Sequence, residues 1–325
     1  MGEFPSVNLG VNKENLRELI NKNYLLFAPE YLTFVVEWLT GTYRAFNDAD
    51  KYFILVYLFN KNLQFYHDNL IQADYETFYR AERIDIQKIN IVEIAKALNI
   101  PKETARRKVT ELESAGVIKK SGKNLVIDKR AFEMVKPTTT IKNLTNVLFV
   151  IYNMCKAQNM VNKNITKEDI SNAMKKNFTF TWLHYYKFIF HWLNNWRAFF
   201  NNDSEMFLVW GVPILHRTYK MKKQQKYDLD ITQYRETIER IETEGINTMS
   251  LSEITGIPRP TVTRKLKYLT SKGYLNMDKN KLIHVGIGAA QNKDMHEIQN
   301  NVLNAFSEFC ATICNQVVIS SRSSK

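Results

Sequence analysis

The spacing of apolar residues predicts two short helices in succession between residues 90 and 114. Asn90 followed by Glu93 is typical of a helix start, because these side chains can satisfy backbone N–H groups that lack a helical partner. The buried side of this helix is supplied by four apolar residues, Val92, Ile94, Ala95 and Leu98. Asn99 can adopt the left-handed conformation that ends a helix, so we expect a tight turn there.

The second helix begins after Pro101, which presets the backbone angle for a helical first turn. Ala105, Val109 and Leu112 form its apolar stripe and leave the opposite face free. Gly116 ends the helix. Two short strands around 117–118 and 125–127 then predict a two-stranded wing with a turn at 121–123.

The same pattern occurs a second time. Residues 90–126 and 247–283 align without a gap and are identical at 10 of 37 positions. The second copy has its turn at Gly256, a helix after Pro258 with the stripe Val262, Leu266 and Leu269, and an end at Gly273. Its wing strands are expected at 274–275 and 282–283.

The similarity extends outside these segments. Trp38 and Arg44 are matched by Trp192 and Arg197, and 146–148 followed by Cys155 is matched by 301–303 followed by Cys310. We therefore predict two tandem domains, 1–160 and 161–325, of ordinary domain size.

Each of the two segments resembles the winged helix-turn-helix of bacterial transcriptional regulators. Residues 93–107 are most similar to the Crp pattern, and residues 256–264 are closer to IclR-type sequences. The resemblance covers about 40 residues in each copy. It implies that the second helix enters the DNA major groove while the wing meets a phosphate backbone or the minor groove.

Candidate DNA-binding residues lie on the free faces of the second helices and at the wing tips. In the family, Lys102, Glu103 and Arg107 occupy positions that usually read bases, although phosphate contact is an equal alternative for each. Pro260 replaces the acidic residue of the Crp pattern in the second copy, so the two DNA half-sites should differ. The full set is Lys102, Glu103, Thr104, Arg106, Arg107, Thr110, Lys120, Lys123, Arg259, Thr261, Thr263, Arg264, Lys267, Lys279 and Lys281.

The distribution of charge agrees with this prediction. The chain has 45 Lys and Arg against 33 Asp and Glu, a formal charge of +12. Residues 90–130 and 247–287 each carry +5, so 82 of 325 residues hold +10 of that charge. Neutralising DNA phosphates requires such a local concentration of cations.

The predicted fold is mainly α with small β wings. Helices are expected before each module, around 12–46 and 166–200, and after it, around 141–157 and 294–317. MarR-type proteins use flanking helices to pair two winged modules. The resemblance therefore implies an intramolecular pseudo-dimer with recognition helices one DNA turn, roughly 34 Å, apart.

The predicted function is a sequence-specific transcriptional regulator that binds double-stranded DNA. Two alternatives remain open at this stage: a replication initiator and a winged-helix scaffold that docks proteins. A monomer with internal pseudo-dimer symmetry is favoured, but association of two chains stays open. We expect no enzymatic activity, because P-loop, HExxH, GxSxG and GxGxxG motifs are missing from the sequence.

Several other features are expected to be structural. The segment 178–200 has 11 aromatic residues in 23 positions, which favours core packing over an effector pocket for a planar ligand. Cys310 and Cys314 share a helix face, with His296 upstream, but apolar neighbours favour packing over a metal site. We therefore predict neither metal nor cofactor. Three cysteines and the absence of a long apolar run predict a cytoplasmic protein without a membrane span.

Overall fold

A computed structural model describes residues 11–86, 89–121, 124–128, 131, 136–224, 228–241, 244–290 and 292–320. This part of the chain is mainly helical and contains two small antiparallel sheets, as predicted. The first half contributes, in chain order, α1 (Lys13–Lys22), α2 (Tyr24–Phe46), α3 (Ala49–Asp68), α4 (Tyr75–Arg80), β1 (Arg83–Ile86), α5 (Ile91–Ala97), α6 (Lys102–Ser114), β2 (Ile118–Ser121), β3 (Asn124–Asp128) and α8 (Thr138–Ala157).

The elements of the second half are α9 (Lys167–Lys176), α10 (Phe178–Phe199), α11 (Ser204–Gln224), α12 (Ile231–Arg240), β4 (Ile246–Asn247), α13 (Thr248–Thr255), α14 (Arg259–Ser271), β5 (Leu275–Met277), β6 (Leu282–Val285), α15 (Ile287–Ala290) and α16 (Lys293–Ser320). The second half follows the same order from its first helix to β6 and then has a short helix, α15, before its last helix. The two halves therefore show a similar succession of elements.

Each predicted helical region before a module is divided at an asparagine. Asn23 separates α1 from α2, and Asn177 separates α9 from α10. Both side chains donate to the carbonyl four residues earlier, on Leu19 at 2.9 Å and on Ala173 at 3.1 Å. Each of these carbonyls also accepts the backbone N–H of the same asparagine at 3.1 Å, so the asparagine side chain adds a second bond that fixes the helix end at the same position in both halves.

Each sheet has three strands, one more than the two-stranded wing that the sequence predicts. β3 pairs antiparallel with β2 but also with β1, with Ile84 opposite Ile127. β6 pairs likewise with β5 and with β4, with Ile246 opposite Ile283. Because β1 and β4 lie about 30 residues or more before the strands that they join, local patterns around those strands could not reveal them.

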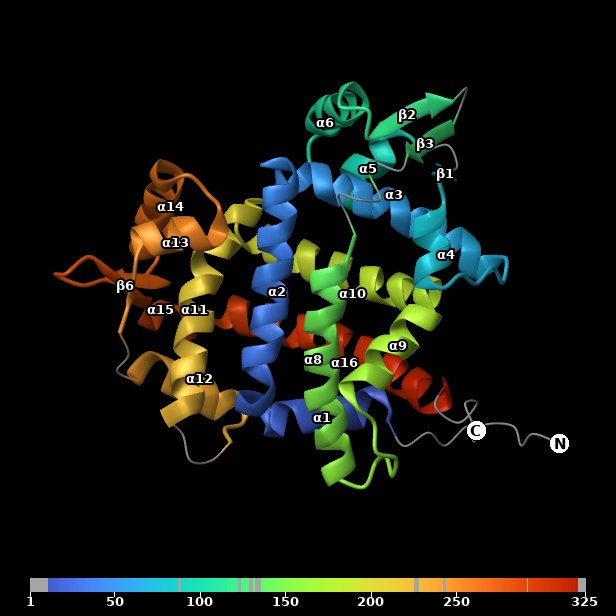
Figure 1. Cartoon of the computed structure of the whole chain (residues 1–325). Helices are drawn as coiled ribbons and strands as arrows, with labels where there is room; N and C mark the ends of the chain where they lie inside the picture. Colours follow the sequence, from blue (N-terminus) through green and yellow to red (C-terminus); the bar gives the residue numbers. More distant parts are fainter. Residues whose placement is uncertain are drawn as a thin grey trace.

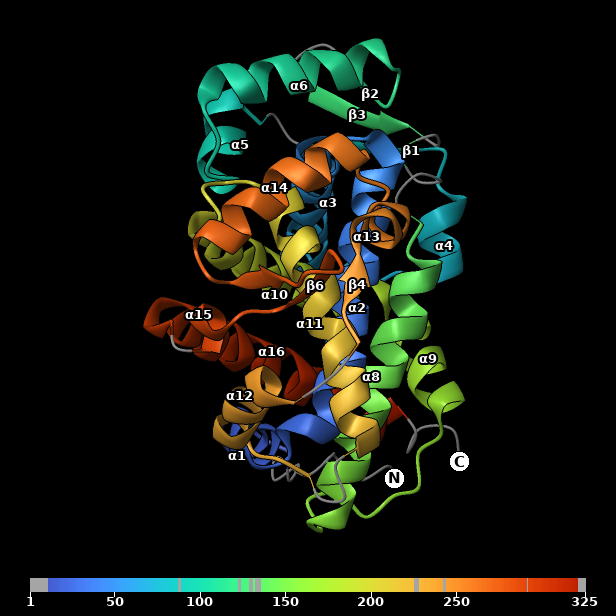
Figure 2. The same cartoon turned by 90° about the vertical axis from the view of Figure 1, so that its left-hand side faces the viewer.

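The core is built from helices of both halves. In Figure 1, α2 and α8 lie side by side in front, while α10 and α16 cross behind them. Contacts also run across the halves, since α2 packs on α11, α10 on α3, α1 on α16 and α8 on α9. Figure 2 shows the elements of both halves in one body. Neither half therefore covers its apolar surface alone.

One helix of the described chain, Lys293–Ser320, is long and apolar enough to cross a membrane by length and composition. In the fold, 61% of its most apolar window is buried. It packs against α1, α9 and α10, as a core helix does.

Candidate nucleic-acid interface

The first candidate recognition helix is α6. The preceding helix, α5, ends at Ala97 with Leu98 as its C-cap, and Asn99 follows with φ 49°, as its left-handed role predicts. Pro101, with φ −57°, then starts α6. Ala105, Val109 and Leu112 are buried beneath it. The predicted free face is exposed at Lys102, Glu103, Arg106, Arg107 and Thr110, whereas Thr104 is half-buried.

The second candidate recognition helix, α14, repeats this arrangement. Gly256 has φ 75° at the end of α13, and Pro258 precedes α14. Val262, Leu266 and Leu269 are buried. The outer face exposes Arg259, Thr263, Arg264 and Lys267, whereas Thr261 is half-buried like its counterpart Thr104. In Figures 1 and 2, α6 and α14 lie at the same end of the molecule.

The two outer faces differ in how much of their charge is compensated. On α6, Arg106 pairs with Glu103 at 3.2 Å, and Arg107 Nε lies 3.7 Å from Glu111. Glu111 also pairs with Lys51 at 2.7 Å. On α14, Arg259, Arg264 and Lys267 form no ion pair within the described residues, and the ion pairs of this helix involve the buried Lys265. The second face therefore has the larger net positive charge available to a polyanion.

Of the two turns predicted as wing tips, the structure describes the second in full and the first only in part. Lys279 and Lys281 are exposed in the turn between β5 and β6, where Asp278 accepts hydrogen bonds from the backbone N–H groups of Asn280 and Leu282. These bonds lower the pKa of Asp278 and fix the turn. In the first wing, Lys120 belongs to β2, and Lys123 lies outside the described residues.

A buried lysine anchors each candidate recognition helix from beneath. Lys108 of α6 pairs with Asp48, and Lys265 of α14 pairs with Asp203. Both lysines are almost fully buried, with 7% and 2% of their surface exposed. The charge of +5 in each repeat segment includes these lysines, and the prediction that this charge is available to DNA is wrong for them, because both side chains point inward. The sequence signal for this inward role is a lysine at the same position of both copies, three residues after Ala105 in one and Val262 in the other.

Asp48 and Asp203 occupy equivalent turns, before α3 and before α11. Asp48 accepts a hydrogen bond from the Asp50 N–H at 3.0 Å, and Asp203 accepts one from the Met206 N–H at 3.0 Å. Each aspartate therefore stabilises the start of a helix and at the same time holds the buried lysine of α6 or α14.

Two arginines connect the halves in a crossed arrangement. Arg197, at the end of α10 in the second half, donates to the Leu98 carbonyl at 3.2 Å, just after α5 of the first half. Arg44, at the end of α2 in the first half, donates to the carbonyls of Glu253 at 2.9 Å and Ile254 at 3.0 Å, on α13 of the second half. Each half thus fixes the first helix of the other half's candidate module.

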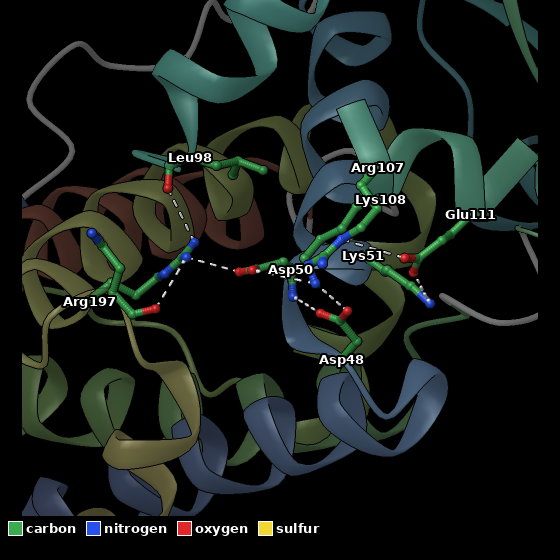
Figure 3. Close-up of polar contacts among 9 residues, drawn as sticks. Asp48, Asp50, Lys51, Leu98, Arg107, Lys108, Glu111 and Arg197 are labelled. Carbon is green, nitrogen blue, oxygen red and sulfur yellow. Dashed lines mark hydrogen bonds and ion pairs between the residues drawn. The ribbon is translucent and has the colours of Figure 1, made fainter. Parts of the chain in front are cut away.

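Arg197 also joins the buried charges, as Figure 3 shows. Its Nη2 lies 2.9 Å from Asp50 Oδ1, and Asp50 Oδ2 lies 3.8 Å from Lys108 Nζ. Burial raises the pKa of Asp50, which the nearby Arg197 and Lys108 charges oppose. Burial also lowers the pKa of Arg197. The network therefore supports α6 from beneath.

The aromatic segment around 178–200 is mostly core, as predicted. It forms α10, and Trp182, Tyr185, Phe188 and Trp192 are at most 2% exposed. Cys155, Cys310 and Cys314 are buried free thiols, and burial raises the pKa of Cys155 to about 11. The described residues contain no group of three side chains suited to hold a metal ion.

No family model, curated protein or solved structure matches this chain. Its function must therefore be argued from its own residues.

Proposed function

We propose that this chain is a sequence-specific double-stranded DNA-binding protein that acts as a transcriptional regulator. In this proposal, α5, α6 and β1–β3 form one winged helix-turn-helix module, and α13, α14 and β4–β6 form the other. The observation that carries it is the pair of equivalent helices, α6 and α14, each with an apolar inner face and an exposed, cation-bearing outer face. A major groove admits a helix of this kind.

The packing between halves supports an intramolecular pseudo-dimer. Lys108 and Lys265 hold the recognition helices to equivalent turns, and Arg44 and Arg197 cross between the halves. A fixed relative position of two recognition helices is what a bipartite operator requires, because half-site spacing follows from protein geometry. The exposed Lys279 and Lys281 are suited to phosphate contacts outside α14.

The unequal charge compensation of the two faces supports two unlike half-sites. Glu103 can accept a hydrogen bond from cytosine N4, whereas Arg259 and Arg264 are suited to guanine. We therefore propose an imperfect repeat as the target rather than a perfect palindrome.

Selection of bound sequences from a random duplex pool by the full chain tests this proposal. The expected result is a bipartite motif with two different half-sites. Binding should weaken steeply with salt, because each neutralised phosphate contributes about 0.9 to the slope of log K against log salt. If no motif is enriched and the chain elutes from heparin already at low salt, the result would instead favour the protein-docking alternative.

Footprinting separates the two DNA-binding alternatives. Protection of promoter segments in the source genome supports regulation, and protection confined to a replication origin supports an initiator.

A further inference from the structure

Two arginines meet at the junction of α1, α12 and α16. Arg17 of α1 and Arg235 of α12 each place Nη2 3.3 Å from the same atom, Oδ1 of Asn300 on α16. Arg235 also donates to Gln299 Oε1 at 2.6 and 2.8 Å, and Arg17 donates to Asn21 Oδ1. Asn300 is exposed. The two guanidiniums therefore converge at a point that a solute can reach.

No carboxylate compensates these two charges within the part of the chain that the structure describes. Every hydrogen-bond partner of the two guanidiniums there is a neutral side-chain amide. Glu18, next to Arg17 in sequence, pairs with Lys22 at 2.7 Å instead. Because arginine stays protonated at physiological pH, the junction holds two positive charges without a counter-charge.

The charges are also partly removed from water. Both arginines are half-buried. Burial lowers the pKa of each guanidinium, and the charge of Arg235 lowers the pKa of Arg17 further. The neighbouring Tyr24 supplies no counter-charge near pH 7, because burial raises its pKa to about 12. Like charges that have lost part of their hydration cost free energy, and an anion bound between them would remove that cost.

The fold itself does not require arginine at these two positions. Counted from the N-cap residues of the paired helices, α1 with α9 and α12 with α4, the counterpart of Arg17 is Ser171 and the counterpart of Arg235 is Tyr79. Both counterparts are neutral, and their helices occupy the same places in the order of elements. The two charges at one surface point therefore call for a reason other than packing.

We propose that the junction of Arg17 and Arg235 binds the phosphate group of a small phosphomonoester. A guanidinium can donate two parallel N–H bonds to phosphate oxygens. A phosphomonoester carries a charge of about −1.5 to −2 at pH 7, which matches two arginines. The phosphate would take the place of the exposed Asn300 amide oxygen between them.

This site goes beyond the proposed DNA-binding function and does not depend on it. In Figures 1 and 2, α1 and α12 lie at the end of the molecule opposite α6 and α14. A duplex bound on the outer faces of α6 and α14 would leave the arginine junction free. Its phosphate is therefore expected to come from a small molecule and not from the DNA backbone.

The test is a titration of the full chain with inorganic phosphate near pH 7 at constant ionic strength, followed through the side-chain Nε–H signals of ¹⁵N-labelled arginine. Single Arg→Gln variants assign the signals. Saturable shifts are expected at Arg17 and Arg235, with Arg80 unchanged, because Arg80 is a single exposed cation at the end of α4. Equal shifts at Arg80, or shifts that do not saturate, would overturn the proposal.

Three variants locate the binding. Arg17→Gln and Arg235→Gln should each weaken phosphate binding about tenfold, the effect of one charge-assisted hydrogen bond. The matched control Arg80→Gln should bind as the wild type does. The dispersed indole N–H signals of the five tryptophans show that each variant is folded. A folded Arg17→Gln or Arg235→Gln variant with wild-type affinity would contradict the site.

Two further probes identify the source of the anion. Acetate, which has one negative charge, should bind more weakly than phosphate, and a random-sequence duplex should leave the signals of Arg17 and Arg235 in place. Acetate binding as tight as that of phosphate would indicate a carboxylate site, and shifts of both arginines by the duplex would indicate a nucleic-acid contact. Either result would overturn the proposal. A duplex that leaves Arg264 unshifted would count against the proposed DNA-binding function alone.

Discussion

The inward lysines show how basic side chains serve two purposes on the same helix. On α14, Arg264 is exposed while its neighbour Lys265 is 2% exposed and paired with Asp203 and Glu205. A charge buried beneath a helix costs free energy unless it is paired. The paired lysine therefore fixes the rotation of α14, and with it the direction of the outer face.

Lys265→Met should lower the free energy of unfolding by about 3 kcal/mol, because it leaves Asp203 and Glu205 without their shared cation. Lys108→Met should cost less, since Asp50 keeps its pair with Arg197. Urea unfolding measures both, with the exposed Lys187→Met as the control. Equal and small losses for all three variants would show that the buried pairs do not stabilise the fold.

His184 makes stability depend on pH. Burial lowers the pKa of this imidazole to about 4, whereas an unfolded histidine titrates near 6.5. Between these values the unfolded chain binds more protons, so stability falls as pH decreases from about 6.5 toward 4.

The Tm of His184→Phe should therefore fall less between pH 7 and pH 5 than the Tm of the wild type. Part of the dependence should persist, because burial also lowers the pKa of His216. Thermal unfolding at the two pH values checks this. A Tm change identical to that of the wild type would exclude His184 as a cause.

At the scale of elements, glycine permits a close approach between the end of β6 and the turn after α14. A Cβ on Gly286 would collide with the Gly273 carbonyl. In contrast, a Cβ on Gly41 in α2 meets nothing within 4 Å. Gly286→Ala should therefore destabilise the chain by about 2 kcal/mol, and Gly41→Ala should stabilise it by up to about 1 kcal/mol. Chemical denaturation of both variants tests the pair, and a neutral Gly286→Ala would contradict this packing.

Some helix ends could be predicted from the sequence, whereas the contacts between distant elements could not. Asn99, Gly256 and Gly273 act through their own backbone conformation, so the turns and ends of α5, α13 and α14 were predictable from local residues. The pairing of β1 with β3 and the crossed contacts of Arg44 and Arg197 join distant segments. No local pattern specifies such partners. The outer faces of α6 and α14 were predictable because helical periodicity separates them from the apolar stripe.

At the scale of the whole molecule, interlocked helices should make the two halves unfold together. Each half buries apolar surface of the other through α1 on α16 and α8 on α9. We expect one calorimetric transition whose van't Hoff and calorimetric enthalpies agree. Two separated transitions would show that the halves are independent domains.

The central claim is that the outer faces of α6 and α14 bind one DNA duplex together. The most direct measurement is fluorescence anisotropy with the selected duplex at moderate salt, comparing Arg107→Ala, Arg264→Ala and their double variant with the wild type. Each substitution should weaken binding by about 1–3 kcal/mol, and the double variant should lose roughly the sum. Lys22→Ala with Lys187→Ala removes the same charge from exposed positions on α1 and α10 and should change affinity little. A double variant that binds as tightly as the wild type, or a control that loses as much, would contradict the account.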